Sequence, residues 1–457
     1  MTRSDGARFD GRRSPGPRRS ALGALGAAAA VGVLLARFVL AGSDSPSPTA
    51  APRPAAGSAA AVGDLEARVR QAPRDPDLLT RLGIAYLQRA RGTADPGYLA
   101  RAGEALGRSG AIESERAETL TGLGLLALAR HDFAAALDLG RRAERLDPAS
   151  PEPLGVIVDA LVELGRYDEA AATAQVMVDR RPSLASLSRV SYLRELHGDP
   201  AGAVTAMTQA SLAGSGSTLD VAAVEALLGD LHLGRGDATR AHAAYSRALS
   251  AVDGFAAAEV GLARVAAARG DLEASAAHLE PVVGRQPQPA WVALLGDVYA
   301  ASGRPADAAT HYELVRHLEA LNRASGMDVD LELARFEADH ARDAGSDAEA
   351  AVAMARSAAA ARPTIFASDT LGWALRQAGQ PQEALAHARD AVRLGTADGT
   401  LWYHLAVVEA DLGLVEDARV HLARALEVSP FLTVRDLPVA RALAAELGLA
   451  LARPPGP

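Results

Sequence analysis

The 457-residue chain contains no cysteine and no lysine, and only 4% of its residues are aromatic. Without cysteine the chain can form no disulfide bond, thiolate nucleophile, cysteine zinc site or lipid-modified N-terminal cysteine. Because 49% of the residues are nevertheless hydrophobic, Ala, Leu and Val supply most of the apolar surface. Such small aliphatic residues favour closely packed helices over a β-sandwich. We therefore expect an all-α protein, and the length indicates several domains or one repeat array.

All basic residues are arginines, and acidic residues outnumber them, so that the net charge is −9. The first 42 residues carry about +5, which leaves about −14 on the remainder. An acidic body disfavours nucleic acid as a partner, because phosphate binding requires a basic face. The composition, rich in Ala, Arg, Gly and Pro, indicates a GC-rich, bacterial genome.

An uncharged apolar run near the N-terminus predicts a membrane segment. Residues 1–19 form a basic tail, and residues 20–42 contain the run SALGALGAAAAVGVLLA, followed by Arg37 and FVLAG. The run is close to the roughly 20 residues that span a bilayer. The arginines before it predict a cytoplasmic N-terminus and an extracytoplasmic body. Residues 43–61 are rich in Ser, Pro and Ala and are expected to form a disordered linker.

Three interpretations of this apolar segment remain open. An uncleaved signal-anchor would give a single-pass protein of the cell membrane, and a cleaved signal peptide would give a secreted protein. The sequence favours the anchor, because Arg37 is unfavourable within the apolar core of a signal peptide. The third interpretation is an apolar tail on a cytoplasmic protein.

A period of about 34 residues runs through the body of the chain. In residues 151–184, three large apolar residues share a helical stripe, Gly165 then ends the helix, and a second stripe stops at Pro182. Recurrence of this unit indicates stacked helix pairs, since one pair alone buries too little apolar surface. Similar units occupy residues 118–148, 223–253, 257–287, 290–320, 366–396 and 400–430.

The repeated unit resembles the tetratricopeptide repeat (TPR) family. The shared pattern is a Trp or Leu, a Leu-Gly pair, a Tyr, then Ala, a large apolar residue, Ala and a closing Pro. Residues 290–320 carry it in Leu295-Gly296 and Ala308. The resemblance covers about residues 77–430 and implies a right-handed superhelical solenoid of about ten helix-turn-helix repeats. We expect one transmembrane or signal helix before it.

Departures from the pattern divide the body of the chain. Residues 62–320 and 364–430 are expected to form TPR repeats. Residues 321–363 fit a second helix but begin with a long acidic segment, so they form either a degenerate repeat or a break between two sub-arrays. Residues 431–457 predict a C-terminal capping helix and tail, because the ends of a solenoid need a cap.

The resemblance implies a groove lined by the first helix of each repeat. One column of residues, counted from the Leu-Gly seam, would face this groove and contains acids, aromatics and an arginine. A Trp, a Phe, an Asp and an Arg on one helical face would also form a patch suited to peptide binding. The alternative is a solvated face that tolerates almost any polar residue. The expected partner-binding residues are Asp159, Tyr192, Asp230, Arg264, Asp297, Phe366, Asp369, Trp373 and Arg376.

Three residues in the weakest repeat share a helical face and could coordinate a divalent ion, namely Glu337, His340 and Asp343. A charged run of this kind is more often a solvated helix face. The sequence contains no Walker A loop, G-x-S-x-G, H-E-x-x-H or kinase signature, so we expect neither catalysis nor a cofactor.

The sequence therefore predicts a membrane-tethered TPR scaffold that binds protein or peptide partners through its concave groove, and no nucleic acid. The tether would raise the effective concentration of the scaffold for membrane or envelope partners. A carboxylate clamp of the chaperone-binding kind is disfavoured, because the chain has no Lys and a single Asn, Asn322. The alternative function is an accessory subunit of a metal-handling or transport system with a weak divalent-ion site.

Overall fold

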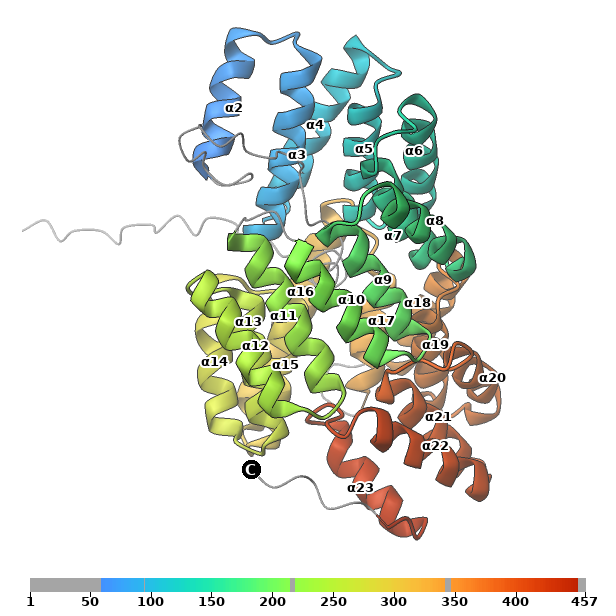
Figure 1. Ribbon diagram of the computed structural model, residues 1–457. Coiled ribbons are helices and arrows are strands. Elements are labelled where there is room, and N and C mark those ends of the chain that lie inside the picture. The colour runs from blue at the N-terminus through green and yellow to red at the C-terminus, as the bar shows by residue number, and fades with distance from the viewer. Residues whose placement is uncertain (1–58, 94, 214–217, 342–346, 451–457) are drawn as a thin grey trace, which may run out of the picture.

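Every regular element in the described part of the chain is an α-helix. The computed structural model describes residues 59–93, 95–213, 218–341 and 347–450. These ranges contain 22 helices, which Figure 1 shows wound into one body. The first eleven are α2 (Ala59–Gln71), α3 (Pro76–Thr93), α4 (Gly97–Ile112), α5 (Ala117–Ala129), α6 (Phe133–Leu146), α7 (Glu152–Glu163), α8 (Tyr167–Arg180), α9 (Leu184–Leu196), α10 (Pro200–Ala213), α11 (Thr218–Gly234) and α12 (Ala238–Ala251). The others are α13 (Ala256–Ala268), α14 (Leu272–Arg285), α15 (Pro289–Ala301), α16 (Pro305–Ala324), α17 (Asp330–Asp339), α18 (Ala348–Ala361), α19 (Ile365–Gln377), α20 (Pro381–Ala391), α21 (Gly399–Asp411), α22 (Val415–Val428) and α23 (Asp436–Glu446).

Consecutive helices in the described ranges pack as ten hairpins, from α3 and α4 to α21 and α22, with α2 and α23 at the two ends. The expectation of an all-α array of helix pairs is confirmed. Residues 321–363 contain the end of the long helix α16 and then the hairpin of α17 and α18. The helical pairing thus continues through the segment with the poorest sequence pattern.

The expected membrane segment at residues 20–42 lies outside the described residues, as do the tail 1–19 and most of the linker 43–61. Helix α2 begins at Ala59, so the last three residues of the expected linker are helical. None of the helices in the described ranges is long and apolar enough to cross a bilayer.

The ends of the helices follow from local chemistry. Asp132 and Asp271 each precede the second helix of a hairpin and accept a hydrogen bond from the backbone N–H three residues later, which satisfies a free donor of that helix. Gly165 ends the first helix of another hairpin with a φ of +68°, a left-handed conformation that side chains disfavour. These signals place the turns at the same point of successive repeats.

Small residues let the helices of neighbouring repeats approach closely. The ring of Tyr245 in α12 is fully buried between Gly229 of α11 and Gly261 of α13. A methyl group added at Gly229 or Gly261 would lie 2.4 or 2.2 Å from a ring carbon of Tyr245. The glycines of the Leu-Gly seam therefore provide the space that the tyrosine of the second helix fills.

Replacing Gly261 with alanine is expected to destabilise the array by roughly 1–3 kcal/mol, because the added methyl group overlaps the Tyr245 ring in a core that cannot relax freely. Gly284 in α14 is the matched control, since nothing lies within 4 Å of a methyl group added there. Gly284→Ala is expected to be neutral or to stabilise by up to about 1 kcal/mol through helix propensity. Urea denaturation of both variants measures the difference, and equal midpoints would contradict the packing argument.

Successive turns of the superhelix contact each other directly. Side-chain hydrogen bonds join residues that lie 195, 197, 198 and 199 positions apart in the chain. At a period of about 34 residues, this separation corresponds to roughly six repeats per turn. In Figure 1 the helices α18 and α19 lie below α7 and α8, at the junction where the Tyr167 hydroxyl accepts a hydrogen bond from the Ile365 N–H at 3.0 Å.

Arg362 connects three helices at this junction. Its guanidinium donates to Glu163 of α7 at 2.5 Å and to Glu332 of α17 at 3.2 Å, and it lies 4.7 Å from the centre of the Phe133 ring of α6. Burial alone would lower the pKa of Arg362, but the two carboxylates outweigh burial and raise it. The side chain is thus a charged link between two turns of the superhelix.

His131 stands where other repeats have a glycine, with a φ of +63°. A non-glycine residue in this conformation costs about 1–2 kcal/mol. The imidazole Nδ1 lies 2.5 Å from the carbonyl oxygen of Asp328 in the next turn, and the ring stacks on Phe133. These contacts offset the backbone strain and explain why a side chain is tolerated here.

The buried carboxyl group of Glu319 in α16 makes stability depend on pH. Burial raises its pKa from 4.5 to about 7, although a hydrogen bond from Asn322 opposes the shift. The folded state then binds this proton more tightly than the unfolded state, so stability is lost as pH rises from about 4.5 to about 7. The loss amounts to about 3 kcal/mol for this group.

Glu319→Gln is therefore expected to raise the free energy of unfolding at pH 8 and to change it little at pH 4.5, since the uncharged amide needs no proton. The control is Glu313→Gln on the same helix, where the side chain is 67% exposed. Denaturation at a series of pH values tests the prediction. A gain that is the same at pH 4.5 and pH 8 would contradict it.

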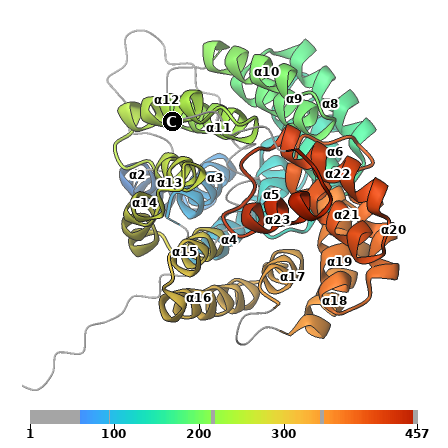
Figure 2. The ribbon, with the colours of Figure 1, turned by 90° about the horizontal axis from the view of Figure 1, so that it is seen from below.

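The C-terminal helix α23 follows the last hairpin of the array. It is the lowest helix of Figure 1, and Figure 2, seen from below, shows it surrounded by the other helices. Two of its alanines, Ala440 and Ala444, are fully buried in the core of the last repeats. The preceding connection crosses towards earlier repeats, because Phe431 packs into the cluster formed by α11 to α13. We next describe the pocket beside this connection.

Candidate functional site

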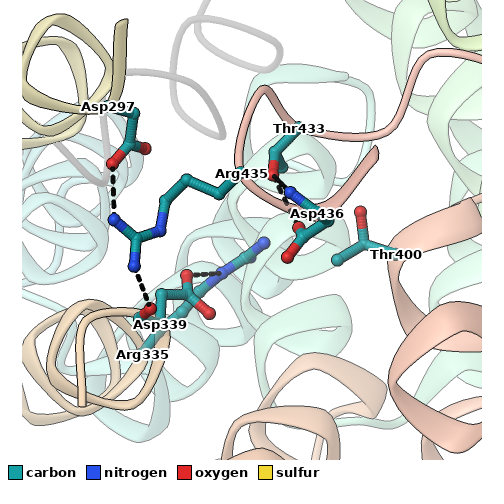
Figure 3. Close-up of a pocket in the computed structure, with 7 residues that line it drawn as sticks. All are labelled: Asp297, Arg335, Asp339, Thr400, Thr433, Arg435 and Asp436. Atoms are coloured by element: carbon teal, nitrogen blue, oxygen red, sulfur yellow. Dashed lines mark hydrogen bonds and ion pairs between the residues drawn. The ribbon is translucent and has the colours of Figure 1, made fainter. Parts of the chain in front are cut away.

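A polar pocket lies at the lower end of the superhelix, between α15, α17, α21 and the connection into α23 (Figure 3). Seven polar or charged residues line it, and they come from parts of the chain that are far apart in sequence. The lining residues are Asp297, Arg335, Asp339, Thr400, Thr433, Arg435 and Asp436.

Asp297 of α15 is the most strongly bound carboxylate of the pocket. It accepts a hydrogen bond from the Tyr312 hydroxyl at 3.0 Å, and His340 Nε2 lies 2.9 Å from the same oxygen. Burial lowers the pKa of His340, but the hydrogen bond and the charge of Asp297 outweigh it and raise the pKa. The imidazole is thus favoured in its charged form, in which Nε2 donates to Asp297.

Arg435 enters the pocket from the connection before α23. Its guanidinium donates to the Tyr312 hydroxyl at 3.1 Å and to the backbone carbonyl of Asp339 at 3.0 Å, and it lies 3.5 Å from Asp297 (Figure 3). One planar guanidinium therefore contacts three acceptors on α15, α16 and α17 at once.

Arg335 and Asp339 of α17 line the pocket and form a loose ion pair with each other. Arg335 Nε lies 3.9 Å from an Asp339 oxygen, and the two side chains are 43% and 33% exposed. Burial raises the pKa of Asp339, and the charge of Arg335 only partly opposes this shift. Both groups retain hydrogen-bonding capacity towards the pocket, so they could bind a polar or charged ligand.

Trp373 was expected to be an exposed anchor of the groove, but the structure buries it. Its indole stacks on the imidazole of His404 in α21 with ring centres 4.0 Å apart, and His404 Nδ1 lies 2.9 Å from Asp369. The first helices of adjacent repeats pack so closely that these side chains fill the space between α19 and α21. Asp369 therefore fixes the imidazole within the core and does not line an open groove.

Asp159 and Tyr192 are also buried. Asp159 of α7 accepts a bidentate pair of hydrogen bonds from Arg189 of α9, at 2.8 and 2.6 Å. This correction has the same cause as that at Trp373, because the column residue of one repeat faces the first helix of the next. Asp230 and Arg264 pair with each other at 2.7 Å and remain partly exposed.

The remaining members of the predicted set lie at the edge of the last repeats. Phe366 is partly buried and packs against the core of the first half of the array. Arg376 donates to Asp411 at 2.7 Å, and its guanidinium lies 5.0 Å from the centre of a Trp373 ring. Of the nine predicted residues, Asp297 lies in the polar pocket.

The structure places two of the three candidate metal ligands in ion pairs. Glu337 accepts hydrogen bonds from Arg316 at 2.7 and 3.1 Å, and His340 faces Asp297. Asp343 lies outside the described residues. Within the described ranges, no three His, Asp or Glu side chains are placed so that they could hold a metal ion together.

Sequence reasoning missed most of the pocket. Arg335 and Asp339 belong to the repeat with the poorest pattern, and Arg435 follows the last recognisable repeat. One signal was available, because the tetrapeptide LLGD occurs at residues 227–230 and 294–297, each followed by a tyrosine 15 residues after the aspartate. In both places the tyrosine on the second helix of a hairpin donates to the aspartate on the first helix.

Models of the tetratricopeptide repeat family match three parts of the chain, one model at residues 127–193 and 232–298 and another at residues 370–432. The chain thus contains tetratricopeptide repeats in these three parts. The matched ranges fall on the helix pairs of α5 to α9, α11 to α15 and α19 to α22, and the second range contains the packing of Tyr245 against Gly229 and Gly261. No curated protein sequence matches this TPR protein.

Several solved structures are similar to this TPR protein at low sequence identity. The APC/C hetero-tetramer Cut9-Hcn1 is 14% identical, with 83% of this chain and 92% of that chain covered and a TM-score of 0.38. A tetratricopeptide repeat protein from Parabacteroides merdae is 14% identical, with 64% and 98% covered and a TM-score of 0.35. A human IFIT1 dimer with PPP-AAAA is 15% identical, with 74% and 78% covered and a TM-score of 0.46.

Proposed function

We propose that this TPR protein is a non-catalytic scaffold that binds protein or peptide partners on the inner surface of its superhelix, at and around the polar pocket of Figure 3. The observation that carries the proposal is the loose pair of Arg335 and Asp339, whose charged groups lie 3.9 Å apart and remain partly exposed in a concave site. A partner could supply the hydrogen bonds that these groups do not make to each other.

The contacts between turns support this proposal because they hold the binding surface in place before a partner arrives. Arg362, at the end of α18, bonds to Glu163 of α7, and Tyr167 of α8 bonds to Ile365 of α19. His131, in the turn after α5, bonds to Asp328 in the connection before α17. A preformed surface loses little conformational entropy on binding, which favours affinity.

The location of the scaffold is proposed from the sequence. The uncharged run within residues 20–42 and the arginines before it suit a single-pass signal-anchor with an extracytoplasmic body, and residues 43–61 suit a tether. Membrane attachment would restrict the search for partners to those near the membrane surface.

Site-specific photo-crosslinking tests the binding surface. A photoreactive residue at Thr400, in the pocket, is expected to crosslink the same discrete protein partners in repeated experiments in intact cells. The control position is Val420 on α22, which is 65% exposed and lies outside the pocket. Equal crosslinking from both positions, or none from Thr400, would contradict binding at the inner surface.

A topology reporter fused after Pro457 tests the location, by comparing the full chain with a variant that lacks residues 1–42. A membrane-bound reporter outside the cytoplasm in the full chain alone is the expected result. A reporter released outside the cell membrane would identify a cleaved signal and exclude the tether. A cytoplasmic reporter would contradict both the orientation and the anchor.

A further inference from the structure

The Asp and Tyr pair at the pocket occurs twice along the inner surface. In one copy the Tyr245 hydroxyl donates to Asp230 at 2.9 Å, and in the other the Tyr312 hydroxyl donates to Asp297 at 3.0 Å. In both copies the tyrosine lies 15 residues after the aspartate, on the second helix of the same hairpin. Both carboxylates also face an arginine, so the recurring unit has an anionic acceptor, a hydroxyl and a guanidinium.

The two arginines come from different parts of the fold. Asp230 receives Arg264 from the next repeat, at the equivalent position of the first helix, and their distance is 2.7 Å. At Asp297 the next hairpin supplies His340 instead, and the guanidinium belongs to Arg435, which follows Tyr312 by 123 residues. The pocket copy therefore takes its arginine from a segment that is no part of the helix pairs.

That segment packs against earlier repeats of the superhelix. Residues 430–435 have no helical structure and connect α22 to α23. Pro430 contacts the turn at Gly236, and Phe431 packs against the cluster of α11 to α13. Arg435 then reaches the Asp297 site, where its side chain is 26% exposed and lies 3.5 Å from the carboxylate.

We infer that Asp297, the Tyr312 hydroxyl and the Asp339 carbonyl form an arginine-binding subsite, which Arg435 occupies in cis and which an arginine of an extended partner segment occupies by displacing that side chain. This inference rests on the proposed scaffold function and names the kind of partner that it takes. Binding of the partner would thus compete with a contact inside the chain.

The chemistry of the subsite selects arginine over lysine. Two nitrogens of one guanidinium contact a hydroxyl and a backbone carbonyl that belong to different helices, and a carboxylate lies beside them. A planar fork can satisfy these acceptors together, whereas an ammonium group is a point charge with a different geometry. Displacing Arg435 would leave the three aspartates of the pocket with Arg335 and His340 as the remaining basic groups, so a cationic replacement is favoured.

Peptide binding to the full chain tests the inference. The probe is the tripeptide acetyl-Gly-Arg-Gly-amide, and the matched probes carry lysine or citrulline in place of arginine. Arg435→Ala is expected to bind the arginine probe at least about tenfold more tightly than the wild type and to discriminate against both other probes. Adding Asp297→Asn to this variant is expected to abolish the gain.

Two controls separate the subsite from general effects on the fold. Arg424→Ala removes an exposed arginine of α22 and should leave binding unchanged. Arg435→Gln also removes the guanidinium from the subsite but keeps more of the side chain for packing. Circular dichroism confirms that each variant is folded. The inference would be overturned if neither Arg435 variant bound the arginine probe more tightly than the wild type. It would also be overturned if the lysine probe bound these variants as tightly as the arginine probe.

Crosslinking from Thr400 distinguishes failure of the subsite from failure of the scaffold. If the inference holds, Arg435→Ala increases the yield of the partner crosslinked to the wild type, and Asp297→Asn decreases it. A partner whose yield responds to neither substitution would leave the scaffold in place and overturn the arginine subsite. If the arginine probe binds tightly to the purified chain but no partner is crosslinked from Thr400, the arginine subsite stands and the scaffold function is contradicted.

Discussion

Replacing Arg362 with methionine is expected to lower the free energy of unfolding by about 3–5 kcal/mol, because the substitution leaves two largely buried carboxylates without their cation. Glu163 and Glu332 are 13% and 14% exposed, and Arg362 is 6% exposed. The urea midpoint at pH 7.5, compared with that of the wild type, measures the loss.

The matched control for this prediction lies on α18, which ends at Ala361 just before Arg362. Arg356 of α18 pairs with Glu383 at 2.7 Å, but these side chains are 49% and 44% exposed. Exposed pairs contribute about 0–1 kcal/mol, so Arg356→Met should change the midpoint little. Replacing Glu163 and Glu332 with glutamine in the Arg362→Met chain should restore part of the loss, since no charge then remains unpaired. A similar loss for Arg356→Met and Arg362→Met would contradict a special role for the buried link.

Replacing Gly198 with alanine is expected to separate two turns of the superhelix. A methyl group at this position would lie 2.2 Å from the backbone carbonyl oxygen of Gly395, and a backbone atom cannot move aside as a flexible side chain can. The expected loss has two parts, about 1–2 kcal/mol for a side chain at a φ of +71° and roughly 1–3 kcal/mol for the displaced contact.

Gly270→Ala isolates the second part. Gly270 has a φ of +81°, and nothing lies within 4 Å of a methyl group added there, so this variant carries the backbone strain alone. Hydrogen exchange of the Ala397 amide reports on the turns themselves, because this N–H donates to the Glu195 carbonyl oxygen across the junction at 3.2 Å. Exchange should accelerate in Gly198→Ala and remain unchanged in Gly270→Ala. Equal stability losses and equal exchange in the two variants would show that the junction adds nothing.

The predicted groove residues show where local patterns stop being sufficient. Asp159 and Trp373 of the predicted column, and Asp369 of the predicted patch, are buried against neighbouring first helices. How open that face is depends on how tightly successive repeats coil, and small differences in helix packing accumulate along the array. Asp297 instead lines the polar pocket, beside the irregular segment that leads into α23.

The polar pocket also shows where local sequence patterns stop being sufficient. Its Asp and Tyr pair has a sequence signal, the recurring LLGD with a tyrosine 15 residues on. Arg435 has none, since it follows the last repeat and meets Tyr312 from 123 residues away. No periodic pattern relates these two positions, so their contact is visible only in three dimensions.

The amino-acid order alone determines the repeats of this protein. Leu-Gly seams, aspartate caps and helix-ending glycines act within about 34 residues, and together they specify where the helices of each pair begin and end. The tertiary structure decided how the array closes and where its polar pocket lies. Arg362 meets Glu163, and the Tyr167 hydroxyl meets Ile365, only because the summed rotation of about six repeats returns the chain to its earlier turn. That sum is a property of the whole superhelix, and no single repeat contains it.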